Sequence, residues 1–90
     1  MSTFNVDMIL PSQCKAARAL IGMTQPQLAY AAGIGLSTVV DFERQRRKVS
    51  GDSVDALQAA LEAAGVEFID ENAGGAGVRM RRPRKTDDSK

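Results

Sequence analysis

The sequence predicts a mainly α-helical domain of four or five helices that ends in a short pair of β-strands. Apolar residues recur at helical spacing up to residue 64, and glycines follow the ends of these segments. After residue 65 the pattern changes to the alternation typical of strands. The chain has 90 residues and few aromatic ones, which indicates a single helical domain at most.

The first two helices are predicted to follow Leu10 and Met23. Pro11 fits a first helical turn, and Gly22 ends that helix. Thr24 is a good N-cap for the second helix, and Gly33 closes it in a left-handed conformation. The residues at helical spacing, expected to face inward, are Cys14, Ala17, Leu20, Ile21, Leu28, Ala29 and Ala32.

The third helix is predicted from about Leu36 to Arg44, with Gly35 at its N-cap and Val39 and Phe42 inward. Its outer face then holds Leu36, Ser37, Thr38, Val40 and Asp41. Ser50 caps the fourth helix and Gly65 stops it. The apolar stripe of that helix consists of Val54, Leu57, Leu61 and Ala64.

Two short strands are predicted at Glu67–Asp70 and Val78–Arg81, joined by a glycine-rich turn. The chain therefore divides into an N-terminal extension (1–10), a helical domain (11–65), a short β segment (66–81) and a charged tail (82–90), which we expect to be disordered.

Charge is distributed unevenly along the chain. Residues 1–70 hold six Lys/Arg and eight Asp/Glu, a net charge of −2, whereas residues 71–90 hold six and three, a net charge of +3. One basic cluster stands within the acidic part: Arg44, Arg46, Arg47 and Lys48. Binding of nucleic acid would therefore depend on local placement of charge.

A spaced pattern runs through the second and third predicted helices: Thr24-Gln25, Leu28-Ala29, Gly33, Ser37-Thr38-Val39 and Phe42-Glu43. This pattern resembles the helix-turn-helix of the lambda-repressor-like family, also called the XRE or Cro-repressor family. The resemblance covers about residues 11–65. The ending Gly65-Val66-Glu67-Phe68-Ile69, with the later Gly77-Val78-Arg79, resembles a subgroup of these bacterial regulators.

The resemblance implies a regulator of transcription that binds double-stranded DNA with the helix at about 36–44 in the major groove. At matching positions, it implies base contacts by Leu36, Ser37, Thr38, Val40 and Asp41. It implies phosphate contacts by Gln25, Arg44, Arg46, Arg47 and Lys48. It also implies an ion pair between Arg18, late in the first helix, and Glu43, which closes the third.

Two departures from the family pattern leave questions open. Gln45 stands where many members have glycine, so the third helix either continues further or leads into a different loop path. The reading face lacks Arg, Gln and Asn, which make the strongest base contacts. Specificity would then depend on apolar contacts and DNA shape, or on further contacts from the N-terminal segment or the basic tail.

One recognition helix reads only a few base pairs, so we expect a homodimer on a palindromic site. The predicted dimerisation residues are the apolar ones of the two strands: Phe68, Ile69, Val78 and Met80. The alternative is that this hairpin folds back onto the fourth helix of its own chain.

Three classes of function compete. A DNA-binding regulator is favoured over the antitoxin of a toxin–antitoxin pair, which would bind a protein partner through its C-terminal segment. An enzyme is not expected, because the chain has no histidine, phosphate-binding loop or metal-ligand spacing, and Cys14 occupies an apolar helix position. No cofactor, metal or membrane association is expected, and the absence of a cysteine pair favours the cytoplasm.

Overall fold

The computed structural model describes residues 8–70 and 74–81, which form four helices and one antiparallel strand pair. The elements are α1 (Pro11–Ile21), α2 (Gln25–Ala32), α3 (Leu36–Arg44), α4 (Gly51–Ala63), β1 (Val66–Ile69) and β2 (Gly77–Met80). The mainly helical fold and the strand pair are confirmed, with each strand beginning one residue earlier than predicted. Residues 1–7 and 82–90, which include most of the predicted extension and tail, lie outside the described residues.

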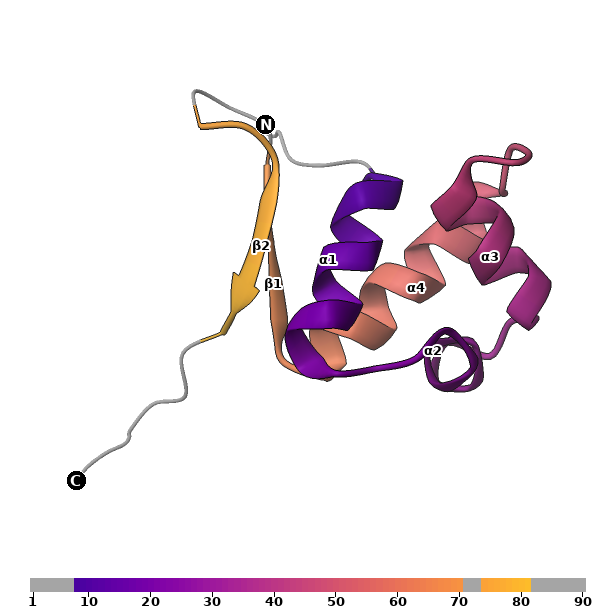
Figure 1. The fold of residues 1–90 in the computed structure, drawn as a ribbon, viewed down its shortest axis with the longest axis horizontal. Coiled ribbons are helices and arrows are strands. Elements are labelled where there is room, and N and C mark those ends of the chain that lie inside the picture. The colour runs from indigo at the N-terminus through magenta and orange to yellow at the C-terminus, as the bar shows by residue number, and fades with distance from the viewer. Residues whose placement is uncertain (1–7, 71–73, 82–90) are drawn as a thin grey trace.

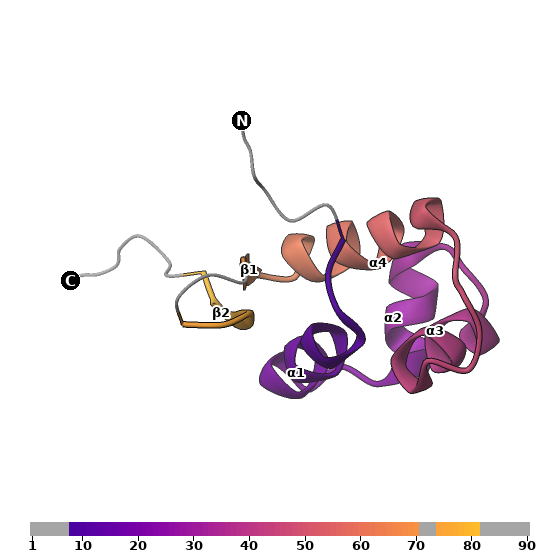
Figure 2. The same cartoon turned by 90° about the horizontal axis from the view of Figure 1, so that it is seen from above.

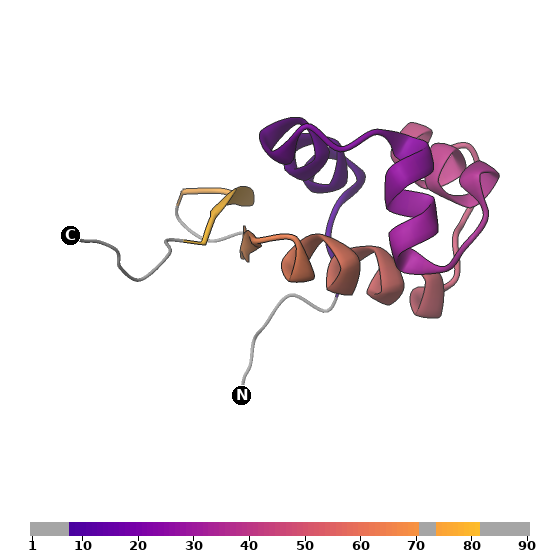
Figure 3. The ribbon, with the colours of Figure 1, turned by 90° about the horizontal axis from the view of Figure 1, so that it is seen from below.

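The helices surround one core, and the hairpin lies at the opposite end of the molecule from α3 (Figure 1). Views from above and below show α2 between α3 and α4 (Figures 2 and 3). In both views α1 and the hairpin lie to the left of α2 and α3, and α1 packs against α3 and α4. Within the described ranges, no helix has both the length and the apolar character needed to cross a membrane.

Local sequence signals explain where α1 and α2 begin and end. Pro11 occupies the first turn of α1, and Gly22 ends that helix with φ of 69°. Thr24 and Gln27 form a capping box at the start of α2. The Thr24 hydroxyl accepts from the backbone N–H of Gln27 at 3.1 Å, and the side-chain Oε1 of Gln27 accepts from the backbone N–H of Thr24 at 2.9 Å. These caps fix the short connection between the two helices.

The core contains residues from all four helices and from β1. Its largest fully buried side chains are Leu28, Leu57, Leu61, Val39, Val54, Val66 and Cys14. The predictions that Leu20 and Ala64 face inward are wrong. Leu20 is 45% exposed, and Ala64 is exposed just after α4 ends. Leu20 lies about 120° around the helix axis from Cys14, at the margin of the buried face.

The hairpin packs on its own chain. Phe68 pairs with Val78 across the two strands, and both side chains pack against the core next to the fully buried Val66. Gln13 of α1 is buried, and its amide N–H groups donate to the carbonyls of Ile69 at 3.2 Å and Gly77 at 3.0 Å. The hairpin therefore rests on α1 as well as on α4, which was the only helix expected to receive it.

Because of this packing, only some of the four residues predicted to form a dimer surface are left for a second copy. Phe68 and Val78 are occupied by contacts within the chain. Ile69 lies on the other face of the hairpin, because side chains alternate along a strand. Met80 pairs with Val66 on the same face as Phe68 and Val78, but it is 46% exposed at the end of β2. Only Ile69 and Met80 therefore remain as candidates for contact with a second copy.

Candidate nucleic-acid interface

The corner between α2 and α3 depends on a left-handed turn at Gly33. Its φ is 72°, a conformation that glycine adopts without steric cost. The N–H of Ile34 donates to the Ala29 carbonyl at 3.1 Å, which closes the end of α2. Ala29 is only 5% exposed, and its small side chain lies in the core that α2 and α3 share. The corner holds α3 in a fixed direction.

One side of α3 is anchored and the other is open. Val39, Phe42 and Glu43 are buried on the inner side. The residues with predicted base contacts lie together on the remaining side, which we call the recognition face: Leu36, Ser37, Thr38, Val40 and Asp41. Leu36 is 45% exposed and Ser37 is exposed, whereas the other three are half-buried.

Glu43 is the centre of a polar network beneath the recognition face. Arg18 holds it with two bonds, from Nε to Oε2 and from Nη2 to Oε1, both at 2.7 Å. Cys14 donates to Oε2 at 3.1 Å and Gln25 donates to Oε1 at 3.0 Å. The ion pair that the resemblance implied is therefore present, and it joins α1, α2 and α3 at one buried carboxylate.

The network shifts the pKa values of Glu43 and Cys14 in opposite directions. Burial acts to raise the pKa of the Glu43 carboxyl, but hydrogen bonds from Arg18, Cys14 and Gln25 outweigh it, so that pKa lies below its ordinary value. Burial first, and then the adjacent Glu43 carboxylate, raise the pKa of the Cys14 thiol. Cys14 thus remains a neutral thiol that donates a hydrogen bond, as its apolar position indicated.

Gln25 was predicted to contact a phosphate, but its side-chain amide already donates one hydrogen bond within the protein. Its side chain is half-buried, and one of its amide N–H groups is directed at Glu43. An amide carries two such donors, so the second one is the only one left for a phosphate. Gln25 is therefore mainly a contact between the start of α2 and the polar network.

The loop after α3 answers the question about Gln45. The helix ends at Arg44, and Gln45 takes the left-handed conformation itself, with φ of 57°. The Arg46 N–H donates to the Asp41 carbonyl at 2.9 Å, which completes the turn. The four basic side chains, which we call the basic loop, are all exposed: Arg44, Arg46, Arg47 and Lys48.

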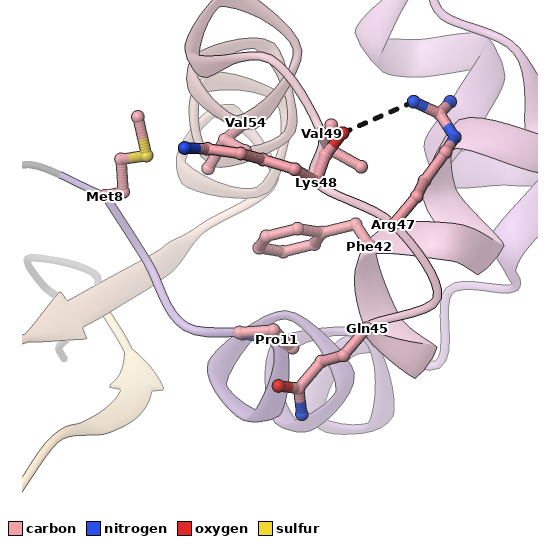
Figure 4. A pocket seen from close by; sticks show the side chains of 8 residues that line it. All are labelled: Met8, Pro11, Phe42, Gln45, Arg47, Lys48, Val49 and Val54. Atoms are coloured by element: carbon pink, nitrogen blue, oxygen red, sulfur yellow. Dashed lines mark hydrogen bonds between the residues drawn. The ribbon is translucent and has the colours of Figure 1, made fainter.

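Asp41 and Arg47 were predicted to have separate roles, but the structure brings them together. Arg47 Nε lies 2.8 Å from Asp41 Oδ2, with side chains that are 52% and 22% exposed. Arg47 Nη1 also donates to the Lys48 carbonyl at 3.5 Å (Figure 4). The six-residue separation crosses a helix end, so the helical spacing rule for side-chain pairs gives no signal for this contact.

Beneath the basic loop lies a shallow apolar hollow (Figure 4). The Phe42 ring points into it, and the stem of Lys48 lies near Val54 of α4. Val49 is 8% exposed and belongs to the core. Sequence reasoning gave Val49 no role, although it anchors the loop that carries the basic side chains.

Among the described residues, no group of three or more His, Cys, Asp or Glu side chains could hold a metal ion. No protein-family model matches the chain, and no curated protein matches it. The features of the molecule that indicate a function are therefore the corner, the recognition face and the basic loop.

Proposed function

We propose that this chain is a sequence-specific regulator of transcription with a lambda-repressor-like helix-turn-helix that binds double-stranded DNA. The observation that carries the proposal is the two-sided α3. Its inner side is fixed by Val39, Phe42 and the Glu43 network, and its outer side presents short polar and apolar side chains at the molecular surface. A major groove about 12 Å wide admits one such helix.

The side chains of the recognition face suit base edges. Ser37 and Thr38 carry hydroxyls that donate to or accept from bases. Leu36 and Val40 offer apolar contact to a thymine methyl group. Since the face has no Arg, Gln or Asn, DNA shape contributes part of the specificity.

The position of the basic loop supports the same orientation of the protein on DNA, with α3 in the major groove. The basic loop begins at Arg44, the last residue of α3, and continues beyond it, so its cations would lie beside the groove that α3 enters, where the phosphates are. These contacts would give affinity for any duplex, while the recognition face would select among sequences.

The test is selection of bound duplexes from a random pool, followed by binding measurements on the enriched site. We expect a palindromic motif, and we expect the Ser37→Ala and Thr38→Ala variants to change the preferred bases. Ser12→Ala is a matched control, because it removes an exposed hydroxyl from α1 and should leave the motif unchanged. The absence of any motif, together with no duplex binding at about 50 mM salt, would refute the proposal.

The dimeric part of the proposal needs its own experiment. Truncation after Gly65 is unsuitable, because it removes the fully buried Val66 and would disturb the core. Ile69→Lys changes the face of the hairpin turned away from Phe68 and Val78, and Met80→Lys changes the exposed end of β2. Ala59→Lys on exposed α4 surface is the control. We expect the hairpin variants, but not the control, to sediment as monomers. Hairpin variants that still sediment as dimers would show that the second copy binds elsewhere.

A further inference from the structure

The position of Asp41 on the recognition face raises a question of charge. DNA presents a dense row of phosphates, and a carboxylate placed against it is repelled. Asp41 is the only acidic residue of that face, and it is half-buried rather than extended outward. Its Oδ2 accepts from Arg47 Nε at 2.8 Å, so its charge is already paired.

The bond also fixes Arg47. A guanidinium has five N–H donors in a rigid fork, and two contacts define its orientation. Here Nε bonds to Asp41 and Nη1 bonds to the Lys48 carbonyl. For Nη2, no partner is found in the described part of the chain. The short bond to Asp41 and the long contact of 3.5 Å to the Lys48 carbonyl therefore favour one orientation of the guanidinium, from which Arg47 presents its remaining donors.

We propose that Asp41 is a positioning residue for Arg47 and not a residue that reads bases. This inference rests on the proposed function, since it assigns Arg47 to a DNA phosphate. The carboxylate holds the guanidinium against the end of α3 and cancels its own repulsion from the DNA. Asp41 could accept from cytosine N4 only after it released Arg47, which would leave a carboxylate unpaired beside the phosphates.

A double-mutant cycle distinguishes the two roles, with Asp41→Ala, Arg47→Ala and the double variant measured on the selected site and on its single-base variants. If Asp41 acts through Arg47, Asp41→Ala lowers the affinity for all sequences by one common factor, about threefold or more, and leaves base preference unchanged. In the Arg47→Ala background the same substitution no longer lowers affinity, because its partner is gone, and it raises affinity for all sequences alike, because it removes an unpaired carboxylate beside the phosphates. Asp41→Asn, which keeps an oxygen that Arg47 Nε can donate to, restores part of the wild-type affinity.

Other outcomes would overturn the inference. If Asp41→Ala alters preference at one base pair, and does so equally in the Arg47→Ala background, Asp41 reads that base directly. If Asp41→Ala binds as the wild type does on every site, the ion pair has no role in binding. Both results require a wild-type protein that binds DNA, so they are distinguishable from failure of the proposed function, in which the wild type itself binds no duplex. Thermal melting of each variant verifies that the compared proteins are folded.

Discussion

Two ion pairs are attached to α3, and they differ in almost every physical respect. The Arg18–Glu43 pair is bidentate, its carboxylate is 2% exposed, and two further donors complete its coordination. The Arg47–Asp41 pair has one short contact, and its arginine is 52% exposed. One helix thus carries a pair directed into the fold and a pair directed toward solvent.

The difference shows how a short helix can be both rigid and exposed. α3 has only nine residues, too few to be stable in isolation. The inner pair ties it to α1, and Gln25 ties the same carboxylate to α2, which leaves the outer side chains available without loss of helix geometry. The inner pair should therefore control stability, while the outer pair should matter mainly for binding.

The largest effect is expected from Arg18→Ala. The variant leaves the buried Glu43 carboxylate without its cation, which should destabilise the fold by about 3–5 kcal/mol. The measurement is the free energy of unfolding in urea. Arg47→Ala is the matched control in the exposed pair, and it should cost about 1 kcal/mol or less. Equal losses in the two variants would remove the distinction between the pairs.

The second-largest effect is expected from acid, which should weaken the stabilisation that the Arg18–Glu43 pair provides. Because the folded pKa of Glu43 lies below its ordinary value of 4.5, its contribution to stability is fully present above that pH. As the pH falls below about 4.5 the unfolded chain takes up the proton first, and this stability is lost progressively down to the folded pKa. Glu43→Gln should show a shallower fall of the melting temperature in acid than the wild type. Parallel pH profiles would mean that another group governs acid unfolding.

A smaller effect distinguishes the two left-handed residues that end α2 and α3. Gly33 and Gln45 have nearly the same left-handed conformation, but only Gly33 is free of its steric cost. We expect Gly33→Ala to lower stability by about 1–2 kcal/mol, since nothing lies within 4 Å of the added methyl group and only the backbone is strained. Gln45→Gly should raise stability by about 0.5–1 kcal/mol, after allowance for the greater entropy of glycine in the unfolded chain. Thermal unfolding of both variants tests this, and a destabilised Gln45→Gly would show that the glutamine side chain supports the loop.

Replacing Arg46, Arg47 and Lys48 together by alanine should change stability by no more than about 1 kcal/mol, because all three are exposed and only the exposed Arg47–Asp41 pair is lost. Binding should respond strongly instead. A dimer with about six phosphate contacts should show a slope of about −5 in a plot of log affinity against log salt concentration. The triple variant should flatten this slope and weaken binding to all sequences alike. Lys15→Ala on exposed α1 is the control for loss of charge alone. An unchanged slope in the triple variant would count against the basic loop.

Much of the fold could be predicted because its signals are local. Pro11, Thr24 and Ser50 begin helices, and Gly22 and Gly33 end them, through contacts within a few residues of chain. Helical spacing likewise separated the inner residues Val39 and Phe42 from the recognition face. The Arg18–Glu43 pair was expected only through resemblance to a family, since no spacing rule joins residues 25 positions apart.

By itself, then, the sequence determined the helices, their caps, the left-handed turn at Gly33 and the existence of a strand pair, because each depends on neighbouring residues. The tertiary structure decided which polar groups meet. It turned Gln25 toward Glu43, paired Asp41 with Arg47, and laid the hairpin on α1 through Gln13. Such contacts join residues from different elements, and their existence depends on distances that only the packed chain defines.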